Sequence, residues 1–279
     1  MSRLFEIDSA AFSAEYGRTS AAVRHTLTDH PLLSVEAIAE LADWLPADRV
    51  EHNLGTVSVV NASGEAQQVD MSPGEIARTI ETNRTWMVLK NIERHPDYKR
   101  LLDACLDEVQ EMVAGREGGM HRREGFIFLS APNSTTPAHT DPEHNILMQV
   151  RGPKLMATGD YPDQAMRQKD LERSYNGGHR NMPVMPANVV EYDMLPGDGV
   201  YLPPDKPHYV KTFDEPSVSL SVTWRTPASE VVRHVHMFNA RIRRFGIQPA
   251  PPGHSAGRDR AKEVILRGMN KVSRVAHRG

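Results

Sequence analysis

The chain has 279 residues, of which 39% are hydrophobic and 25% are charged, as in an ordinary globular protein. A formal net charge of -3 excludes a general attraction to nucleic acid, and a single cysteine, Cys105, excludes internal disulfides and cysteine-rich zinc clusters. Any metal must therefore be bound through nitrogen and oxygen. No run approaches the roughly 18 apolar residues that cross a bilayer, and the acidic start is unlike a secretory signal. We expect a cytoplasmic protein without a membrane segment.

Helical patterns dominate residues 1–120. Ser34 precedes VEAIAELADWL and Ser72 precedes PGEIARTIE, so that each serine can cap the start of a helix. Residues 85–92, TWMVLKNI, form an apolar run that fits a short buried strand. Residues 95–113 then return to helical spacing. We therefore expect a helical N-terminal region, with one short strand, that packs on the core.

Residues 121–225 have a different texture, in which short β-like runs alternate with turn residues. The runs are GFIFLS, NILMQV, KLMATG, NVVEYDML, GVYLP, HYVKTF and SVSLSVTW. Many short strands predict a sandwich or barrel, so this part is expected to be the β core. The segment at about 160–190 is too long for a tight connection; a lid that faces the substrate and an uninvolved surface both stay open.

Residues 226–279 are expected to form a helical C-terminal tail, because Thr226 and Pro227 are a typical helix start. Basic residues outnumber acidic ones from residue 241 onward. A solvated helical face explains this charge more simply than a patch for a polyanion or acidic partner, so nucleic acid is not an expected partner. Val231, Val235 and Phe238 recur at helical spacing, and this apolar face could pack on the core or form a homodimer interface.

The segment TTPAHTDPEHN contains a candidate metal-binding motif. His139 and Asp141 are separated by one residue, so their side chains point the same way if the segment is extended. In LPGDGVYLPPDKPHYV, a turn and a strand precede His208. Two imidazoles and one carboxylate on one face of an octahedron leave three positions open, which suits Fe(II), although Mn, Co, Ni and Zn stay open. Because the imidazoles must be neutral, metal affinity is expected to fall below roughly pH 6.5.

TPAHTDPEHNILMQVRGPKLM and LPGDGVYLPPDKPHYV together resemble the JmjC-type, cupin-fold Fe(II)/2-oxoglutarate oxygenases. The resemblance covers about the central hundred residues, and it is greatest to the group of the asparaginyl hydroxylase that acts on hypoxia-inducible factor. It implies a mainly β fold with helical flanks, built on a double-stranded β-helix core. It also implies a dioxygenase that uses Fe(II), 2-oxoglutarate and O₂, hydroxylates a C–H bond, and releases succinate and CO₂.

The same resemblance implies roles for individual residues. His139, Asp141 and His208 match the iron ligands, and Lys154 matches the lysine that pairs with the distal carboxylate of 2-oxoglutarate. A cation there makes physical sense, because the co-substrate carries a second carboxylate at its far end. Further contacts to the co-substrate are implied for Thr136, Asn145 and Thr223, the last of which replaces an asparagine of the family. The aromatic partner of the co-substrate is not fixed; the candidates are Phe126, Phe128 and Tyr201. His144 is expected behind the ligands or at the surface.

Two other functions stay open at this stage. A metal-dependent cupin enzyme without 2-oxoglutarate would use the same triad and would have no need of Lys154. A non-catalytic regulatory or binding protein could keep the β core and use its basic tail for binding. The substrate of an oxygenase is not determined either, so a protein side chain, an amino acid and a small metabolite all remain candidates.

Overall fold

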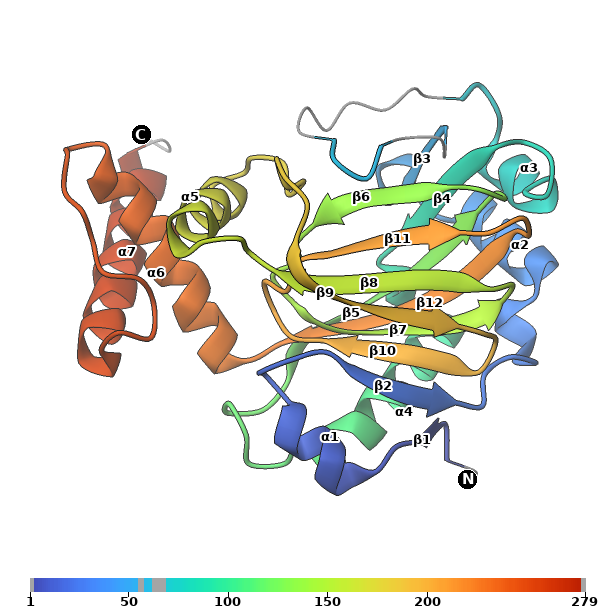
Figure 1. Cartoon of the computed structure of the whole chain (residues 1–279), viewed down its shortest axis with the longest axis horizontal. Coiled ribbons are helices and arrows are strands. Elements are labelled where there is room, and N and C mark those ends of the chain that lie inside the picture. Colours follow the sequence, from blue (N-terminus) through green and yellow to red (C-terminus); the bar gives the residue numbers. More distant parts are fainter. Residues whose placement is uncertain (1–2, 55–57, 62–68, 277–279) are drawn as a thin grey trace.

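Two antiparallel β-sheets dominate the computed structural model, which describes residues 3–54, 58–61 and 69–276 (Figure 1). The larger sheet has the strand order β1-β2-β10-β7-β12-β5-β4-β3. The bounds of its strands, in that order, are Phe5–Glu6, Ala21–His25, Asp198–Leu202, His144–Arg151, Ser217–Arg225, His121–Ser130, Thr85–Lys90 and Val50–Leu54. The smaller sheet has the order β6-β11-β8-β9, with the bounds Thr135–His139, His208–Thr212, Lys154–Asp160 and Ala187–Met194. The facing sheets confirm the predicted double-stranded β-helix core.

The sequence of β12 explains how the larger sheet can separate a polar interior from an apolar exterior. In SVSLSVTW, hydroxyl residues alternate with Val218, Leu220, Val222 and Trp224, and successive side chains of a strand point to opposite faces. The four apolar residues belong to the main hydrophobic core, on the side covered by helices. The hydroxyls consequently face the space between the two sheets.

The neighbouring strand β7 alternates in the same way. Ile146, Met148 and Val150 belong to the main core, whereas Asn145 and Leu147 line the space between the sheets. His144 is on the core side, where it is 1% exposed and stacks on Trp224. The expectation that His144 lies close behind the metal ligands or at the surface was therefore wrong, because the alternation of β7 turns it away from them.

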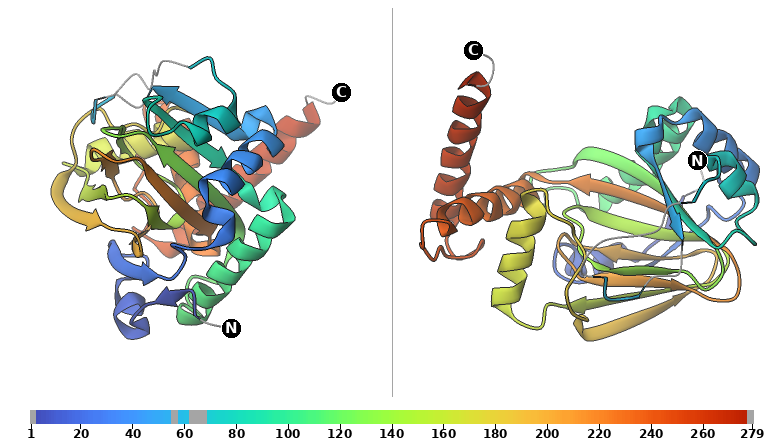
Figure 2. Two further views of the ribbon diagram at one scale, coloured as in Figure 1. Left: turned by 90° about the vertical axis from the view of Figure 1, so that its right-hand side faces the viewer. Right: turned by 90° about the horizontal axis from the view of Figure 1, so that it is seen from above.

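Four helices cover the outer face of the larger sheet (Figure 2). Their bounds are Ser9–Glu15 for α1, Val35–Trp44 for α2, Pro73–Arg78 for α3 and Pro96–Met112 for α4. The predicted caps are present, since the Ser34 and Ser72 hydroxyls accept hydrogen bonds from the third amide of their helices. Each cap typically contributes about 1 kcal/mol to helix stability.

The N-terminal part contains more strand than its sequence pattern predicts. The expected strand is present as β4, but β1, β2 and β3 also join the larger sheet. Strands of two to five residues carry too little periodicity to be found from sequence. Of these strands, β3 matters for the site, because β3 and β4 form one edge of the larger sheet and residues of both strands line the pocket.

Three further helices build an arm that extends from the barrel (Figure 2). These are α5 (Gln164–Tyr175), α6 (Pro227–Arg243) and α7 (Ala256–Ala276), and α6 packs against both α5 and α7. Thr226 caps α6 through a capping box, as its sequence predicts. In the part of the chain that the structure describes, none of the helices combines the length and the apolar character needed to span a bilayer.

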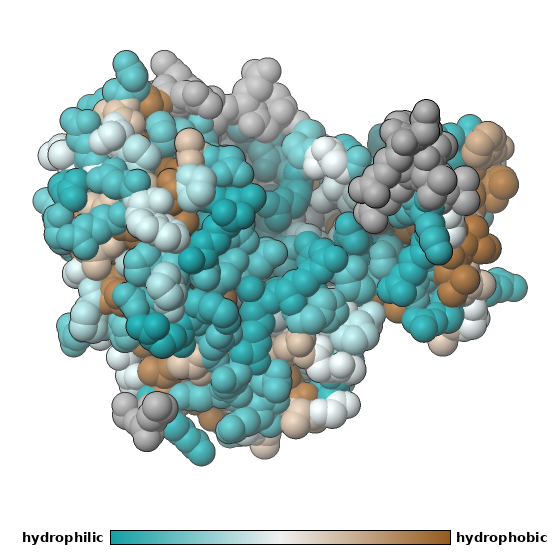
Figure 3. Space-filling view, turned by 180° about the vertical axis from the view of Figure 1, so that it is seen from behind, coloured by the Kyte–Doolittle hydropathy of each residue, from teal (hydrophilic) through white to brown (hydrophobic). Residues whose placement is uncertain are grey.

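The arm carries apolar side chains that the rest of the chain does not cover. Val235 is fully buried between helices, but Val264, Ile265 and Met269 of α7 are 58%, 50% and 46% exposed. Phe245, in the connection after α6, is 82% exposed. Figure 3 shows hydrophobic residues gathered on this arm. Contiguous exposed apolar surface of this kind is typical of an interaction site.

Candidate functional site

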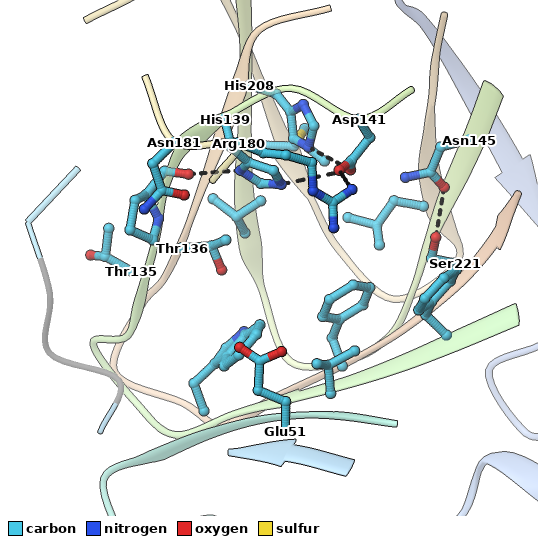
Figure 4. Close-up of a pocket in the computed structure, with 18 of the residues that line it drawn as sticks. Glu51, Thr135, Thr136, His139, Asp141, Asn145, Arg180, Asn181, His208 and Ser221 are labelled. Atoms are coloured by element: carbon cyan, nitrogen blue, oxygen red, sulfur yellow. Dashed lines mark hydrogen bonds and ion pairs between the residues drawn. The ribbon is translucent and has the colours of Figure 1, made fainter. Parts of the chain in front are cut away.

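A pocket of about 310 Å³ lies between the two sheets, and nearly all sequence-predicted site residues line it. Figure 4 shows that His139, Asp141 and His208 cluster at one side and that Glu51 lies across the pocket from them. The strand β11 pairs with β6 so that His208 is directly opposite His139. This register explains how His139 and His208, which are 69 positions apart in sequence, come to share one site.

The three candidate ligands converge on one point. The Nε2 atoms of His139 and His208 each lie 3.6 Å from Oδ2 of Asp141, and ligand atoms of all three residues lie within 4.8 Å of one another. Two ligand atoms bound at right angles to one octahedral ion, with bonds of roughly 2.1 Å, are about 3 Å apart. The separations between Asp141 and the two histidines are therefore close to the spacing that one shared ion requires.

Backbone carbonyls fix the proton positions of both histidines. His139 Nδ1 lies 2.8 Å from the carbonyl oxygen of Pro137, and His208 Nδ1 lies 3.0 Å from that of Lys206. A carbonyl oxygen only accepts, so each Nδ1 carries the proton and donates. Each neutral ring therefore presents the lone pair of Nε2 toward Asp141, which is the arrangement that a metal-binding histidine requires.

Charge and burial determine the protonation states of the candidate ligands. Burial raises the pKa of Asp141, but Arg180, His139 and His208 outweigh this effect and hold the pKa well below its usual value. Burial also lowers the pKa of His208, to about 4. At neutral pH the site consequently offers one carboxylate and a neutral His208 imidazole. The donor set of two nitrogens and one oxygen fits Fe(II) or a similar divalent ion.

Lys154 lies at the inner end of the same pocket. It is 2% exposed on β8, and its Nζ donates to the Ser219 hydroxyl, which in turn donates to Oε1 of Gln149 at 2.7 Å. Among the described residues, no carboxylate lies within ion-pair distance of this ammonium, and burial lowers its pKa to about 7. A buried cation that lacks a counter-charge is costly, so this end of the pocket favours an anionic ligand.

Thr136, Asn145 and Thr223, the other predicted co-substrate contacts, also line the pocket. The carbonyl oxygen of Asn145 accepts from the Ser221 hydroxyl at 2.7 Å, which turns its NH₂ group toward the interior (Figure 4). Thr223 lies opposite Asn145 in the β7–β12 pair, and its hydroxyl donates to the Glu124 carbonyl. The three residues therefore share the pocket with the triad, and their roles as co-substrate contacts stay predictions.

The structure separates the three aromatic candidates. Phe126 and Phe128 line the pocket, whereas Tyr201 belongs to the core on the other face of the larger sheet. There its hydroxyl accepts from the Gly17 amide and lies 2.9 Å from His144 Nδ1. Trp86 also lines the pocket, from β4.

Sequence reasoning missed several residues of the site. Ser219 and Ser221 bond Lys154 and Asn145, and the alternation in SVSLSVTW could have indicated their direction. Arg180, which follows α5, donates from Nη1 to Oδ1 of Asp141 at 2.6 Å. No local pattern marks Arg180, because its position depends on how the segment after α5 crosses β6.

The fold and this pocket define a JmjC-domain protein. Residues 87–232 match the JmjC domain family, which is just over half of the chain, so the chain belongs to this family.

Particular relatives agree with that assignment. The chain is 34% identical over 108 residues to Jumonji C domain-containing protein 5 of Drosophila melanogaster, and the match covers 35% of this chain and 26% of the fly protein. The matched region is thus about a quarter of that relative. Among solved structures, Escherichia coli ycfD superposes with a TM-score of 0.56 and 16% identity, covering 96% of this chain and 68% of the other. A structure of the ribosomal oxygenase YcfD with cobalt and 2-oxoglutarate gives 0.54 and 14%, covering 95% and 67%. At such identities the likeness concerns the fold.

Proposed function

We propose that this protein is an Fe(II)- and 2-oxoglutarate-dependent dioxygenase that hydroxylates a C–H bond and releases succinate and CO₂. One observation carries the proposal: a single pocket contains both the convergent His139, Asp141 and His208 and the buried Lys154, which has no carboxylate partner among the described residues. In the β11–β8 pair, His208 is at one end and Lys154 is at the other. A metal and a cation so separated in one pocket match a ligand that has a 2-oxo acid at one end and a carboxylate at the other. The complex of YcfD with cobalt and 2-oxoglutarate supports this proposal at the level of the fold.

The protein residues would bind, orient and shield the reactants. His139, Asp141 and His208 would hold iron, which with 2-oxoglutarate and O₂ supplies the oxidising chemistry. Lys154 would bind the distal carboxylate, with Ser219 holding the ammonium in place. Phe126 and Phe128 would exclude water from the co-substrate. Such a dry, pre-organised site strengthens each charged contact and leaves the mouth of the pocket for the substrate.

The direct test is formation of succinate from 2-oxoglutarate by the purified protein with Fe(II) and O₂, in the presence of candidate proteins, peptides and amino acids. We expect turnover that depends on both Fe(II) and 2-oxoglutarate. The proposal is refuted if there is no turnover and if calorimetry also detects no binding of 2-oxoglutarate to the metal-loaded protein.

The alternative of a cupin enzyme that does not use 2-oxoglutarate shares the triad but gives Lys154 no ligand. Replacing Lys154 discriminates the two, because only the dioxygenase depends on it for co-substrate binding. The alternative of a non-catalytic binding protein predicts no metal-dependent turnover, and salt-sensitive binding of a polyanion to the basic tail would favour it.

The narrower expectations stay proposals. Membership of the group of asparaginyl hydroxylases, a protein side chain, amino acid or small metabolite as substrate, and a cytoplasmic location all rest on the sequence. A homodimer through the C-terminal helices is supported by the exposed Val264, Ile265 and Met269 of α7. The basic residues of the same helix give no separate reason to expect nucleic acid as a partner.

A further inference from the structure

The two carboxylate oxygens of Asp141 have different partners. Oδ2 lies 3.6 Å from Nε2 of both His139 and His208, so this oxygen faces the position of the ion. Oδ1 accepts a hydrogen bond from Nη1 of Arg180 at 2.6 Å, which is a charge-assisted contact of the strong kind. Figure 4 shows the guanidinium beside Asp141. Oδ2 of Asp141 is thus directed toward the metal position, whereas Oδ1 is hydrogen-bonded to Arg180.

Arg180 is held in place by the backbone on both sides. Before it, Gly177 adopts a φ of +89°, and the Gly178 amide bonds the carbonyl of Arg173 at 3.0 Å, which ends α5 tightly. After it, Asn181 forms a β-bridge with His139, and the Met182 amide donates to the carbonyl of Ala138 at 2.7 Å. The backbone next to Arg180 is therefore hydrogen-bonded to β6, the strand that carries His139. The Arg180 side chain is nevertheless 51% exposed.

We propose that Arg180 is a positioning residue that restricts Asp141 to metal binding through one oxygen. The inference rests on the proposed function, since its purpose is to keep coordination positions open. An octahedral ion with three protein ligands has three open positions, two for the 2-oxo acid and one for O₂. A carboxylate that bound through both oxygens would take one of them. Partners that orient metal-binding groups from behind commonly have such effects on affinity and activity.

The charge of Arg180 supports a positioning role over a role in metal retention. A cation next to a divalent ion repels it, so Arg180 lowers the affinity of the site for metal. Glu143 and Glu51 also face this guanidinium, and Arg225 pairs with Glu143 and adds positive charge nearby. A residue selected only for tight metal binding would not be cationic. Removing Arg180 should consequently leave metal affinity unchanged or increase it, while reducing the number of open positions.

The test counts the water molecules on a bound ion. Mn(II) is added to the protein, and the relaxation of water protons reports how many exchangeable waters the ion carries. We expect about three waters in the wild type and about two in Arg180→Ala. Arg180→Lys, which retains a cationic donor, should behave like the wild type. Arg151→Ala is the matched control, because Arg151 pairs with Glu81 at 2.9 Å and is 50% exposed away from the site.

A second measurement follows 2-oxoglutarate binding to the Mn(II)-loaded proteins by calorimetry. We expect Arg180→Ala to bind Mn(II) at least as tightly as the wild type and to bind 2-oxoglutarate at least roughly tenfold more weakly. The inference is overturned if Arg180→Ala keeps the wild-type number of waters, or if it loses Mn(II) altogether. If 2-oxoglutarate displaces no water from the wild type, the proposed function fails, and the water count of Arg180→Ala still decides the role of Arg180.

Discussion

Replacement of Lys154 by methionine is expected to have opposite effects on co-substrate binding and on stability. Methionine has a similar length and no charge, so it fills the same buried space on β8. Loss of one charged hydrogen bond costs about 1.5–3 kcal/mol, and the distal carboxylate of 2-oxoglutarate would then be buried without a partner. We therefore expect the affinity of the metal-loaded protein for 2-oxoglutarate to fall by roughly ten- to a hundredfold or more.

The effect on stability follows from the pKa of Lys154. Burial lowers this pKa to about 7 in the folded chain, against 10.5 when the lysine is exposed. The folded state therefore releases this proton more readily than the unfolded state, so wild-type stability rises with pH between about 7 and 10.5. Below pH 7 the wild type must bury a charged ammonium, which costs on the order of a few kcal/mol. The methionine variant avoids this cost.

Two assays check these expectations on the same protein. Calorimetry with Mn(II)-loaded protein measures 2-oxoglutarate affinity, and thermal unfolding at pH 6 and pH 9 measures stability without the co-substrate. A gain of about 2 kcal/mol at pH 6 would raise the midpoint by roughly 4–8 °C, and the gain should shrink at pH 9. Lys99→Met, at an exposed lysine of α4, is the control and should change neither quantity. Unaltered 2-oxoglutarate affinity in Lys154→Met would refute the assignment of Lys154.

Three further predictions concern the triad and the arm. His139→Ala should abolish retention of metal after desalting, as measured by elemental analysis; unchanged metal content would remove His139 from the ligands. Metal affinity should fall as the pH drops below roughly 6.5, because imidazole ligands bind metal only when neutral, but less steeply than for two exposed histidines, since burial lowers the pKa of His208 to about 4; a decline as steep as two protons per metal between pH 6.5 and 5 would contradict this. Analytical ultracentrifugation should reveal a homodimer, because Ile265 and Met269 are about half exposed on α7. The double substitution Ile265→Glu and Met269→Glu should convert it to a monomer. A wild type that is monomeric at high concentration would contradict the homodimer.

The β core could be predicted from sequence because its strands carry strong local signals. SVSLSVTW alternates over eight residues, and NILMQV is mainly apolar, so both are found by period and composition. β1, β2 and β3 were missed, since they become strands only through pairing with distant neighbours. The division at residues 120 and 225 stays a prediction; the larger sheet takes strands from both of the first two parts, and the third part contributes the helices α6 and α7.

The candidate site could be predicted for those residues that lie together in a short sequence motif. His139 and Asp141 share one short segment, and the turn and strand before His208 indicate a similar edge. Arg180 could not be predicted, because its guanidinium reaches Asp141 through the bridge between Asn181 and His139. The lowered pKa of His208 could not be predicted either, since the burial that causes it is a property of the folded chain.

The most direct measurement is the anomalous diffraction of a crystal grown with Mn(II) and 2-oxoglutarate in the absence of O₂. The account predicts one strong peak within bonding distance of Nε2 of His139, Nε2 of His208 and a single oxygen of Asp141, with the far carboxylate of 2-oxoglutarate beside Nζ of Lys154. A manganese ion bound elsewhere, or a co-substrate whose far carboxylate lies away from Lys154, would contradict it.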